Sequence, residues 1–165
     1  MRHPQKAEPV GSDMAASRDL RLFHDANLAE IGVLRNRGTG GKPGISVEIY
    51  AFDGAYLSFA IALPTEAMAG LRLSDLFRVE LDMGVERQIG VSVRLNLRHG
   101  PNVERIVRRL DISSGERMVE FDISYTAFNP ERSRDIWFDI IFDHPAMNRI
   151  DIHDMQILRR GRADI

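Results

Sequence analysis

Aromatic, arginine, amide and carboxylate side chains occupy the polar positions of segments in which apolar and polar residues alternate. Trp137 and Asp139 alternate with apolar residues in one segment, and Arg94 and Asn96 do so in another. An aromatic ring can pack on the C–H face of a sugar, while guanidinium, amide and carboxylate groups bond its hydroxyls. We predict a ligand-binding sheet face made of Trp137, Arg94, Asn96 and Asp139, together with Asp122 from a third segment. The alternative is a solvated face with cross-strand ion pairs.

Two pairs of carboxylates at i, i+2 spacing raise the alternative of a glycoside hydrolase. They are Glu80 with Asp82 and Glu120 with Asp122. Residues two apart on a strand have Cα atoms roughly 6.5–7 Å apart. Retaining glycosidases need carboxyls about 5–5.5 Å apart, and inverting enzymes need about 6.5–9.5 Å. Such pairs are also common on exposed strands, so we expect no catalytic residues, although the question of enzymatic activity stays open.

The histidines give no recognised metal motif. They are His3, His24, His99, His144 and His153, and none forms a His-x-His or His-Glu-x-x-His pair. The absence of cysteine removes disulfides, thiol catalysis and cysteine-ligated zinc. We therefore expect no metal site and no cofactor, with a calcium site at an end of the fold as the alternative.

Alternation of apolar and polar residues is the dominant pattern in the last two-thirds of the chain. In Val91–Arg98 the valines and leucines point one way, and Ser92, Arg94, Asn96 and Arg98 point the other. A first strand is predicted at Leu20–His24. Further strands are predicted at Ile45–Phe52, Tyr56–Leu63, Leu76–Met83, Gln88–Arg98, Arg105–Ile112, Glu116–Ser124, Asp135–Asp143 and Arg149–Leu158.

Several connections are less regular. Asp53-Gly54-Ala55 predicts a hairpin turn between the two flanking strands. Ala26–Arg37 fits a short helix or an extended piece, and Val103–Leu110 fits helical spacing as well as a strand. Pro64–Asp75 predicts a short helix near residues 65–71 that crosses an end of the fold. His99-Gly100-Pro101-Asn102 predicts a tight turn.

The inward residues of these strands form matching apolar faces. Val91, Val93, Leu95 and Leu97 match those of the segments that contain Phe77, Val119 and Phe138. Two sheets that pack such faces about 10 Å apart would share one core. The sequence therefore predicts an all-β fold, a two-sheet antiparallel β-sandwich with a jelly-roll-like arrangement and one short helix.

Size and charge limit the classes of partner. The chain has 165 residues, 44% of them hydrophobic, and a net charge of −2. We predict a disordered leader at 1–18 and a single domain at 19–165. The charge does not favour nucleic acid, no stretch is long enough to span a membrane, and the N-terminus has no apolar core of a signal peptide. We expect a cytoplasmic protein.

Several words of the sequence, taken in order, resemble an uncharacterised bacterial protein family, a domain of unknown function. They are "LFHD" at Leu22–Asp25, "FDGAYLSFAIALP" at Phe52–Pro64, "RLNLRHGPN" at Arg94–Asn102, "MVEFDISYT" at Met118–Thr126 and "WFDIIFDHPAMNRIDIHDMQILRR" at Trp137–Arg160. The resemblance covers about residues 20–165 and implies no reaction or ligand. The short leader departs from the helical, basic N-terminal region of longer members.

At the level of the fold, the pattern is also similar to jelly-roll carbohydrate-binding modules and galactose-binding-like sandwiches, above all in the Ile-Asp-Ile rhythm at Ile150–Asp154. Fold similarity does not imply function. The sequence favours a non-catalytic binding module that recognises a carbohydrate or another polar small ligand. The alternative is a protein-interaction or structural β-sandwich, such as a homodimer or an accessory domain, without a small ligand.

Overall fold

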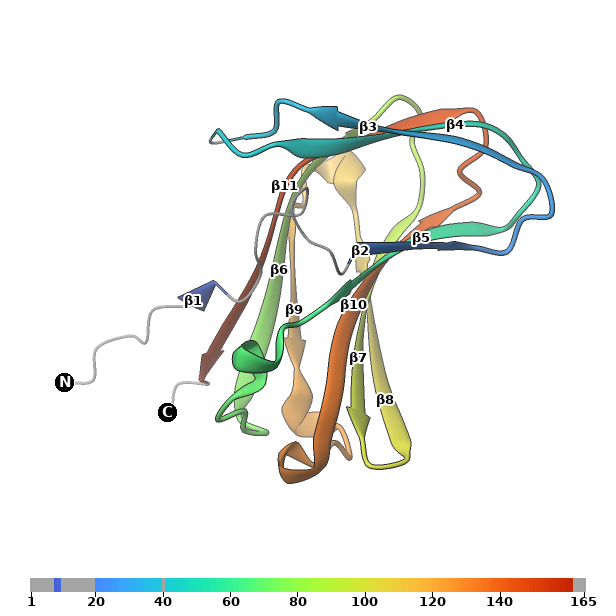
Figure 1. Ribbon diagram of the computed structural model, residues 1–165. Coiled ribbons are helices and arrows are strands. Elements are labelled where there is room, and N and C mark those ends of the chain that lie inside the picture. The colour runs from blue at the N-terminus through green and yellow to red at the C-terminus, as the bar shows by residue number, and fades with distance from the viewer. Residues whose placement is uncertain (1–7, 10–19, 40, 162–165) are drawn as a thin grey trace.

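The computed structural model describes residues 8–9, 20–39 and 41–161, which form two stacked antiparallel sheets (Figure 1). Sheet A contains, in spatial order, β3 (Ala29–Asn36), β4 (Gly44–Phe52), β11 (Asn148–Gly161), β6 (Asp75–Val85) and β9 (Met118–Asp122). Sheet B contains β2 (Leu20–His24), β5 (Tyr56–Ala62), β10 (Ser133–Asp143), β7 (Val91–His99) and β8 (Asn102–Leu110). This confirms the predicted β-sandwich.

The short elements complete the description. A two-residue strand, β1 (Glu8–Pro9), pairs with β11. The predicted helix near 65–71 is one 3-10 turn, η1 (Thr65–Met68), and three more such turns are η2 (Ile112–Ser114), η3 (Ile123–Tyr125) and η4 (Pro130–Arg132). Most of the predicted leader lies outside the described residues.

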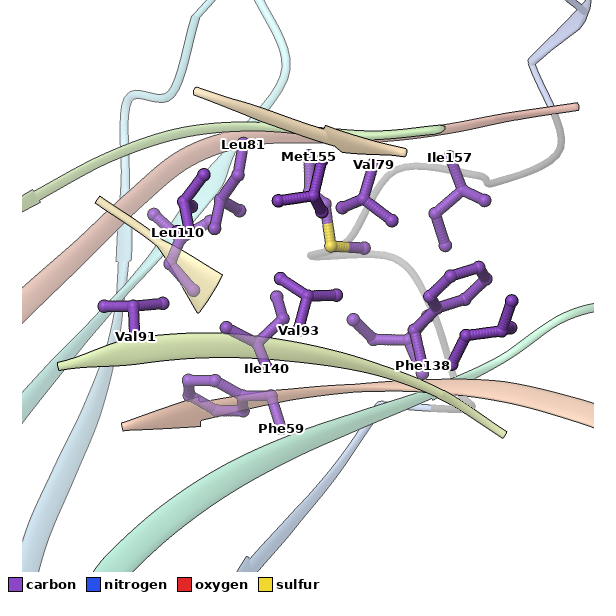
Figure 2. Close-up of a cluster of buried hydrophobic side chains, with 14 of the residues drawn as sticks. Phe59, Val79, Leu81, Val91, Val93, Leu110, Phe138, Ile140, Met155 and Ile157 are labelled. Atoms are coloured by element: carbon purple, nitrogen blue, oxygen red, sulfur yellow. The ribbon is translucent and has the colours of Figure 1, made fainter. Parts of the chain in front are cut away.

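The core joins the inward faces of the two sheets (Figure 2). Phe138 of β10 makes edge-to-face contacts with Phe77 of β6 and Phe121 of β9, with ring centroids 5.9 and 5.7 Å apart. Each of these rings is at most 1% exposed. Burying one such side chain contributes roughly 1.5–3 kcal/mol to the stability of the fold. A one-residue slip of a central strand would turn all of its buried side chains to solvent and lose several such contributions.

The hairpin predicted around Asp53-Gly54-Ala55 is wrong, because this segment crosses from one sheet to the other. β4 pairs with β3 and β11, whereas β5 pairs with β2 and β10. A second crossing at residues 25–28 lies beside it. Asp25 accepts hydrogen bonds from the backbone N–H groups of Ala55 and Tyr56, and Asp53 accepts from those of Asn27 and Leu28. The two loops thus supply the partners that a hairpin would have provided.

The ambiguous segments are strands. The segment Ala26–Arg37 contains β3, and Val103–Leu110 lies within β8, so the helical alternatives are wrong. Cross-strand burial overrides the weak helical spacing there. The tight turn is confirmed, since His99 pairs with Asn102 and Gly100 has a φ of 54°.

Removal of the central ring should test the core directly. We expect Phe138→Ala to lower the free energy of unfolding by about 3–5 kcal/mol, because it leaves a cavity between the sheets. Tyr125→Ala removes a ring that is 83% exposed and should change stability by less than about 0.5 kcal/mol. Denaturant titration followed by circular dichroism measures both, and equal effects would contradict the proposed core.

Candidate functional site

Four of the five predicted binding residues lie together on the outer face of sheet B. Trp137 of β10 is paired with Asn96 of β7, and Asp139 is paired with Arg94 in the next outward position. The fifth residue, Asp122, is on β9 in sheet A. The alternation in the sequence predicted that each of these side chains points outward from its strand. The pairing of β7 with β10 brings the four together.

Asp122 has a local structural role at the end of its strand. Its carboxylate accepts hydrogen bonds from the backbone N–H and the hydroxyl of Ser124, and so caps the turn η3. It lies in the opposite sheet from Trp137, so it does not belong to the surface that the other four residues share.

Asp139 is the centre of a polar network within that surface. One of its oxygens accepts hydrogen bonds from Nε and Nη2 of Arg94, at 3.0 and 2.9 Å, and from Nδ2 of Asn96, at 2.9 Å. Asn96 also donates to the backbone carbonyl of Trp137, at 3.2 Å. Asp139 is 4% exposed and Asn96 is 0% exposed, whereas the side chain of Arg94 is 37% exposed. The network therefore holds Arg94 and the backbone of Trp137 in place.

A shallow trough of about 480 Å³ lies beside Trp137 on the same face. Its floor is β5, where Ala62 is paired with Trp137 and Ala60 is paired with Arg21 of β2. Phe23 of β2 is 49% exposed and lines the other side. Two aromatic side chains thus flank a floor of two methyl groups.

The sequence analysis did not identify Phe23, Arg21, Ala60 or Ala62 as site residues. The one feature of the sequence that could have pointed to them is their outward parity in two predicted strands. Parity alone could not place β5 next to β10, and thus β2 next to β5 on the same face, because the pairing of β5 with β10 joins segments about 80 positions apart.

Arg98 restricts one approach to the trough. Its guanidinium carbon lies 5.6 Å from the centroid of the Trp137 ring, a cation–π arrangement, and its Nη1 lies 3.7 Å from Asp135. Leu63 closes the floor near this pair. The segment that follows Leu63 is held against sheet A, because Arg159 of β11 bonds Asp75 and the carbonyl of Ala67. No residue of this segment lines the trough, which therefore opens outward on sheet B.

The paired carboxylates lie on the outer face of sheet A, and three of the four, Glu80, Asp82 and Glu120, form ion pairs with arginines. Arg78 bonds Glu120 at 2.8 Å and Glu80 at 3.5 Å, and Arg117 bonds Asp82 at 3.2 Å. The hydrogen bond with Glu120 raises the pKa of Arg78 above its ordinary value. These ion pairs favour ionised carboxylates, whereas a glycosidase must hold one acid protonated. The arrangement gives no support to a hydrolase.

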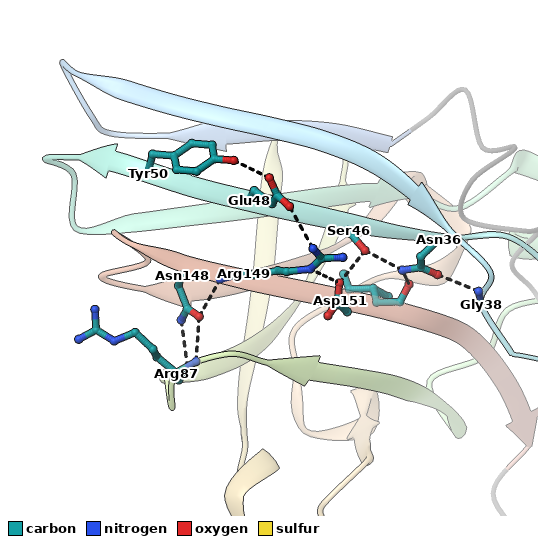
Figure 3. Close-up of polar contacts among 10 residues, drawn as sticks. Asn36, Gly38, Ser46, Glu48, Tyr50, Arg87, Asn148, Arg149 and Asp151 are labelled. Atoms are coloured by element: carbon teal, nitrogen blue, oxygen red, sulfur yellow. Dashed lines mark hydrogen bonds and ion pairs between the residues drawn. The ribbon is translucent and has the colours of Figure 1, made fainter.

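A second polar network stiffens the other end of sheet A (Figure 3). Arg149 bridges Glu48 and Asp151, and Ser46 donates to Asp151 at 2.6 Å. Asn36 donates in turn to Ser46, and Tyr50 donates to Glu48. Burial acts to raise the pKa of Asp151, but the hydrogen bonds from Ser46 and Arg149 outweigh it, and the pKa lies below its ordinary value. The network ties β3, β4 and β11 together.

The described residues hold no group of three or more His, Cys, Asp or Glu side chains arranged to bind a metal ion. Two histidines have backbone partners. His24 accepts from the N–H of Ala26, and His99 accepts from that of Asn129. In the same part of the chain, no helix has the length and apolar character needed to cross a membrane.

The fold and site define an antiparallel β-sandwich with an aromatic trough on the outer face of one sheet. The sequence matches the model of a family of unknown function (DUF6478) over residues 2–165, and the chain belongs to this family. This confirms the resemblance to a domain of unknown function. No curated protein matches the sequence significantly.

Solved structures share the fold at low identity. The family 11 carbohydrate-binding module from Clostridium thermocellum, in complex with a β-1,3-1,4-mixed-linked tetrasaccharide, is similar with a TM-score of 0.53 and 11% identity, over 96% of this chain and 98% of that one. The enzymatically active domain of tailspike protein 4 from bacteriophage CBA120 has a TM-score of 0.59 and 8% identity, and the match spans 91% of this chain but only 21% of the tailspike chain. A cyclase from Fischerella sp. TAU has a TM-score of 0.50 and 11% identity, over 89% and 87%.

Loss of the central carboxylate should destabilise the site region. We expect Asp139→Asn to lower the free energy of unfolding by about 1–3 kcal/mol, because Arg94 loses its charged acceptor in a nearly buried position. Asp135→Asn, in an exposed pair with Arg98, should cost at most about 1 kcal/mol. Urea midpoints of the two variants provide the comparison, and a larger loss for Asp135→Asn would refute the assignment.

The second network predicts a defined response to acid. Because folding lowers the pKa of Asp151, its ionised form stabilises the protein above the ordinary Asp pKa of about 3.9, and this contribution disappears as pH falls through the lowered value. Asp151→Asn removes the titration. The difference in unfolding free energy between wild type and variant should therefore shrink between about pH 5 and pH 2. Urea unfolding at several pH values measures it, and a constant difference would contradict the shift.

Proposed function

We propose that the protein is a non-catalytic carbohydrate-binding module whose ligand lies in the trough on the outer face of sheet B. The observation that carries the proposal is the partly exposed Trp137 beside the floor of Ala60 and Ala62, with Phe23 on the far side. The apolar face of a pyranose ring can pack on such aromatic groups, and methyl-sized floor residues leave room for it.

The polar edge of the trough supplies partners for hydroxyl groups. The side chain of Arg94, on the strand next to Trp137, is 37% exposed and is held by Asp139, which Asn96 bonds in turn. Arg98 and Asp135 add a donor and an acceptor beside Trp137. Because these groups sit on paired strands and are already bonded, little conformational entropy is lost on binding. In this proposal, Asn96 and Asp139 position the site and Trp137 and Arg94 contact the ligand.

The comparisons support a carbohydrate ligand at the level of the fold. One similar structure, the family 11 module, contains a bound tetrasaccharide, but at 11% identity it shares only the fold. The fold is also similar to that of a cyclase, so the fold alone does not select a function. The aromatic trough and the arginine-paired carboxylates of sheet A favour binding over catalysis. The proposed site needs no metal ion or organic cofactor.

The single tryptophan makes the proposal directly testable. A panel of neutral and acidic tetrasaccharides should produce a saturable change in the fluorescence of Trp137 for at least one member. Calorimetry should then show that Trp137→Ala weakens that ligand about tenfold or more, the equivalent of roughly 1.4 kcal/mol of stacking. Ala62→Leu, which fills the floor and keeps the tryptophan, should weaken it as well.

Tyr125→Ala serves as the matched control, because it removes an exposed aromatic ring that does not line the trough. Tyr125 lies in η3, directly after β9 of sheet A. The substitution should leave affinity unchanged. Absence of saturable binding by every sugar, or full affinity in Trp137→Ala, would refute the proposal. Concentration-dependent self-association in the same samples would then favour the interaction domain, for which the exposed Val33 and Leu34 on the edge strand β3 offer a contact surface.

A further inference from the structure

We propose that the glycan is acidic and that its carboxylates bind Arg21 and Arg105 on either side of Trp137. This inference rests on the proposed function and adds the charge of the ligand. The protein as a whole carries a net charge of −2. The described strands of sheet B nevertheless present more arginines than acids on their outer face. The arginines are Arg21, Arg94, Arg98, Arg105 and Arg109, and the acids are Asp135, Asp139 and Asp143.

Each of the three aspartates is already matched to one arginine. Asp139 is bonded to Arg94 at 2.9 Å. The other two pairs are looser and more exposed, Arg98 with Asp135 at 3.7 Å and Arg109 with Asp143 at 3.5 Å. Three cations on this face are therefore neutralised by aspartates of β10, two of them from the adjacent strand β7 and one, Arg109, from β8.

Arg21 and Arg105 are the two that remain. Within the described part of the chain, neither side chain forms an ion pair or a hydrogen bond, and both residues are exposed. Structural ion pairing accounts for the other arginines of the face but not for these two. Because a guanidinium offers planar, paired donors, a carboxylate is its natural partner.

The positions of the two arginines frame the trough. Arg21 lines it on β2, opposite Ala60. Arg105 on β8 lies opposite Asn96, in the same cross-strand row as Trp137. Each is two strands away from Trp137, which corresponds to about 10 Å between strand axes. A sugar that stacks on Trp137 would thus meet a free cation at both ends of its path across the strands.

Spacing of this kind fits a chain that carries repeated carboxylates better than a single small anion. A uronic acid oligosaccharide combines C–H faces for Trp137 and Phe23 with carboxylates for Arg21 and Arg105. Surface attraction between such exposed groups is screened by salt, so the acidic part of the affinity should fall at high ionic strength.

A matched pair of ligands tests the inference. The probes are a uronic acid tetrasaccharide and the same tetrasaccharide after reduction of its carboxyl groups to alcohols. Calorimetry at low salt should show about tenfold or tighter binding of the acidic form by the wild-type protein. Arg21→Gln and Arg105→Gln should each remove a large part of that preference, because each removes one cation from the outer face of sheet B. Added salt should also reduce the preference.

Arg108→Gln is the matched control. Arg108 is exposed on the same strand as Arg105, but it is paired with Val93 and so has the inward parity. Its loss should leave the preference intact. Thermal unfolding of all three variants should match wild type, because none of these arginines has an ion-pair partner among the described residues.

The alternative results separate the inference from the proposed function. Equal affinity for both forms, still lost in Trp137→Ala, would overturn the acidic ligand and keep the sugar site. No binding of either form, or binding that survives Trp137→Ala, would overturn both. A sulfated tetrasaccharide or inorganic phosphate that binds as tightly as the uronic acid form would overturn the assignment to carboxylates.

Discussion

The outer face of sheet B can present Trp137 to solvent because the inner face of the same strand is locked in the core. Phe138, the next residue, contacts Phe77 and Phe121 of the opposite sheet. Since side chains alternate along a strand, the burial of Phe138 fixes the outward direction of Trp137 and Asp139. The placement of the trough thus depends on the packing between the sheets.

The polar network around Asp139 then converts this placement into a defined surface. A buried carboxylate is costly unless it is paired and hydrogen-bonded, and here Arg94 and Asn96 provide three donors. The same contacts connect β7 with β10 and bond the backbone of Trp137. The residues that the sequence marked as ligand contacts therefore divide into two groups, one that supports the surface and one that is open to a ligand.

Periodicity was sufficient to predict most strands and their buried faces, because burial on one side produces a two-residue repeat in any strand. It was not sufficient to predict partners. Gly44–Phe52 and Tyr56–Ala62 have the pattern of a hairpin, yet they pair with strands of different sheets. The bonds of Asp25 and Asp53 hold the crossing in place, but nothing in the alternation of residues indicates them. The misplacement of Asp122 has the same origin. Its outward parity was read correctly, but the sheet to which β9 belongs is not encoded in that parity.

Ion pairing offers a criterion for separating structural from functional arginines on such a face. An arginine opposite an aspartate on the neighbouring strand offsets a charge that the sheet itself introduces, as Arg94 does for Asp139. An exposed arginine without such a partner adds positive charge to that face, where it is close to other arginines, and so favours an external anion. Arg21 and Arg105 meet this second description, and they lie on opposite sides of the one tryptophan. The unbalanced charge and the aromatic platform therefore occupy the same surface, and a ligand that satisfies both must combine apolar ring faces with negative charge.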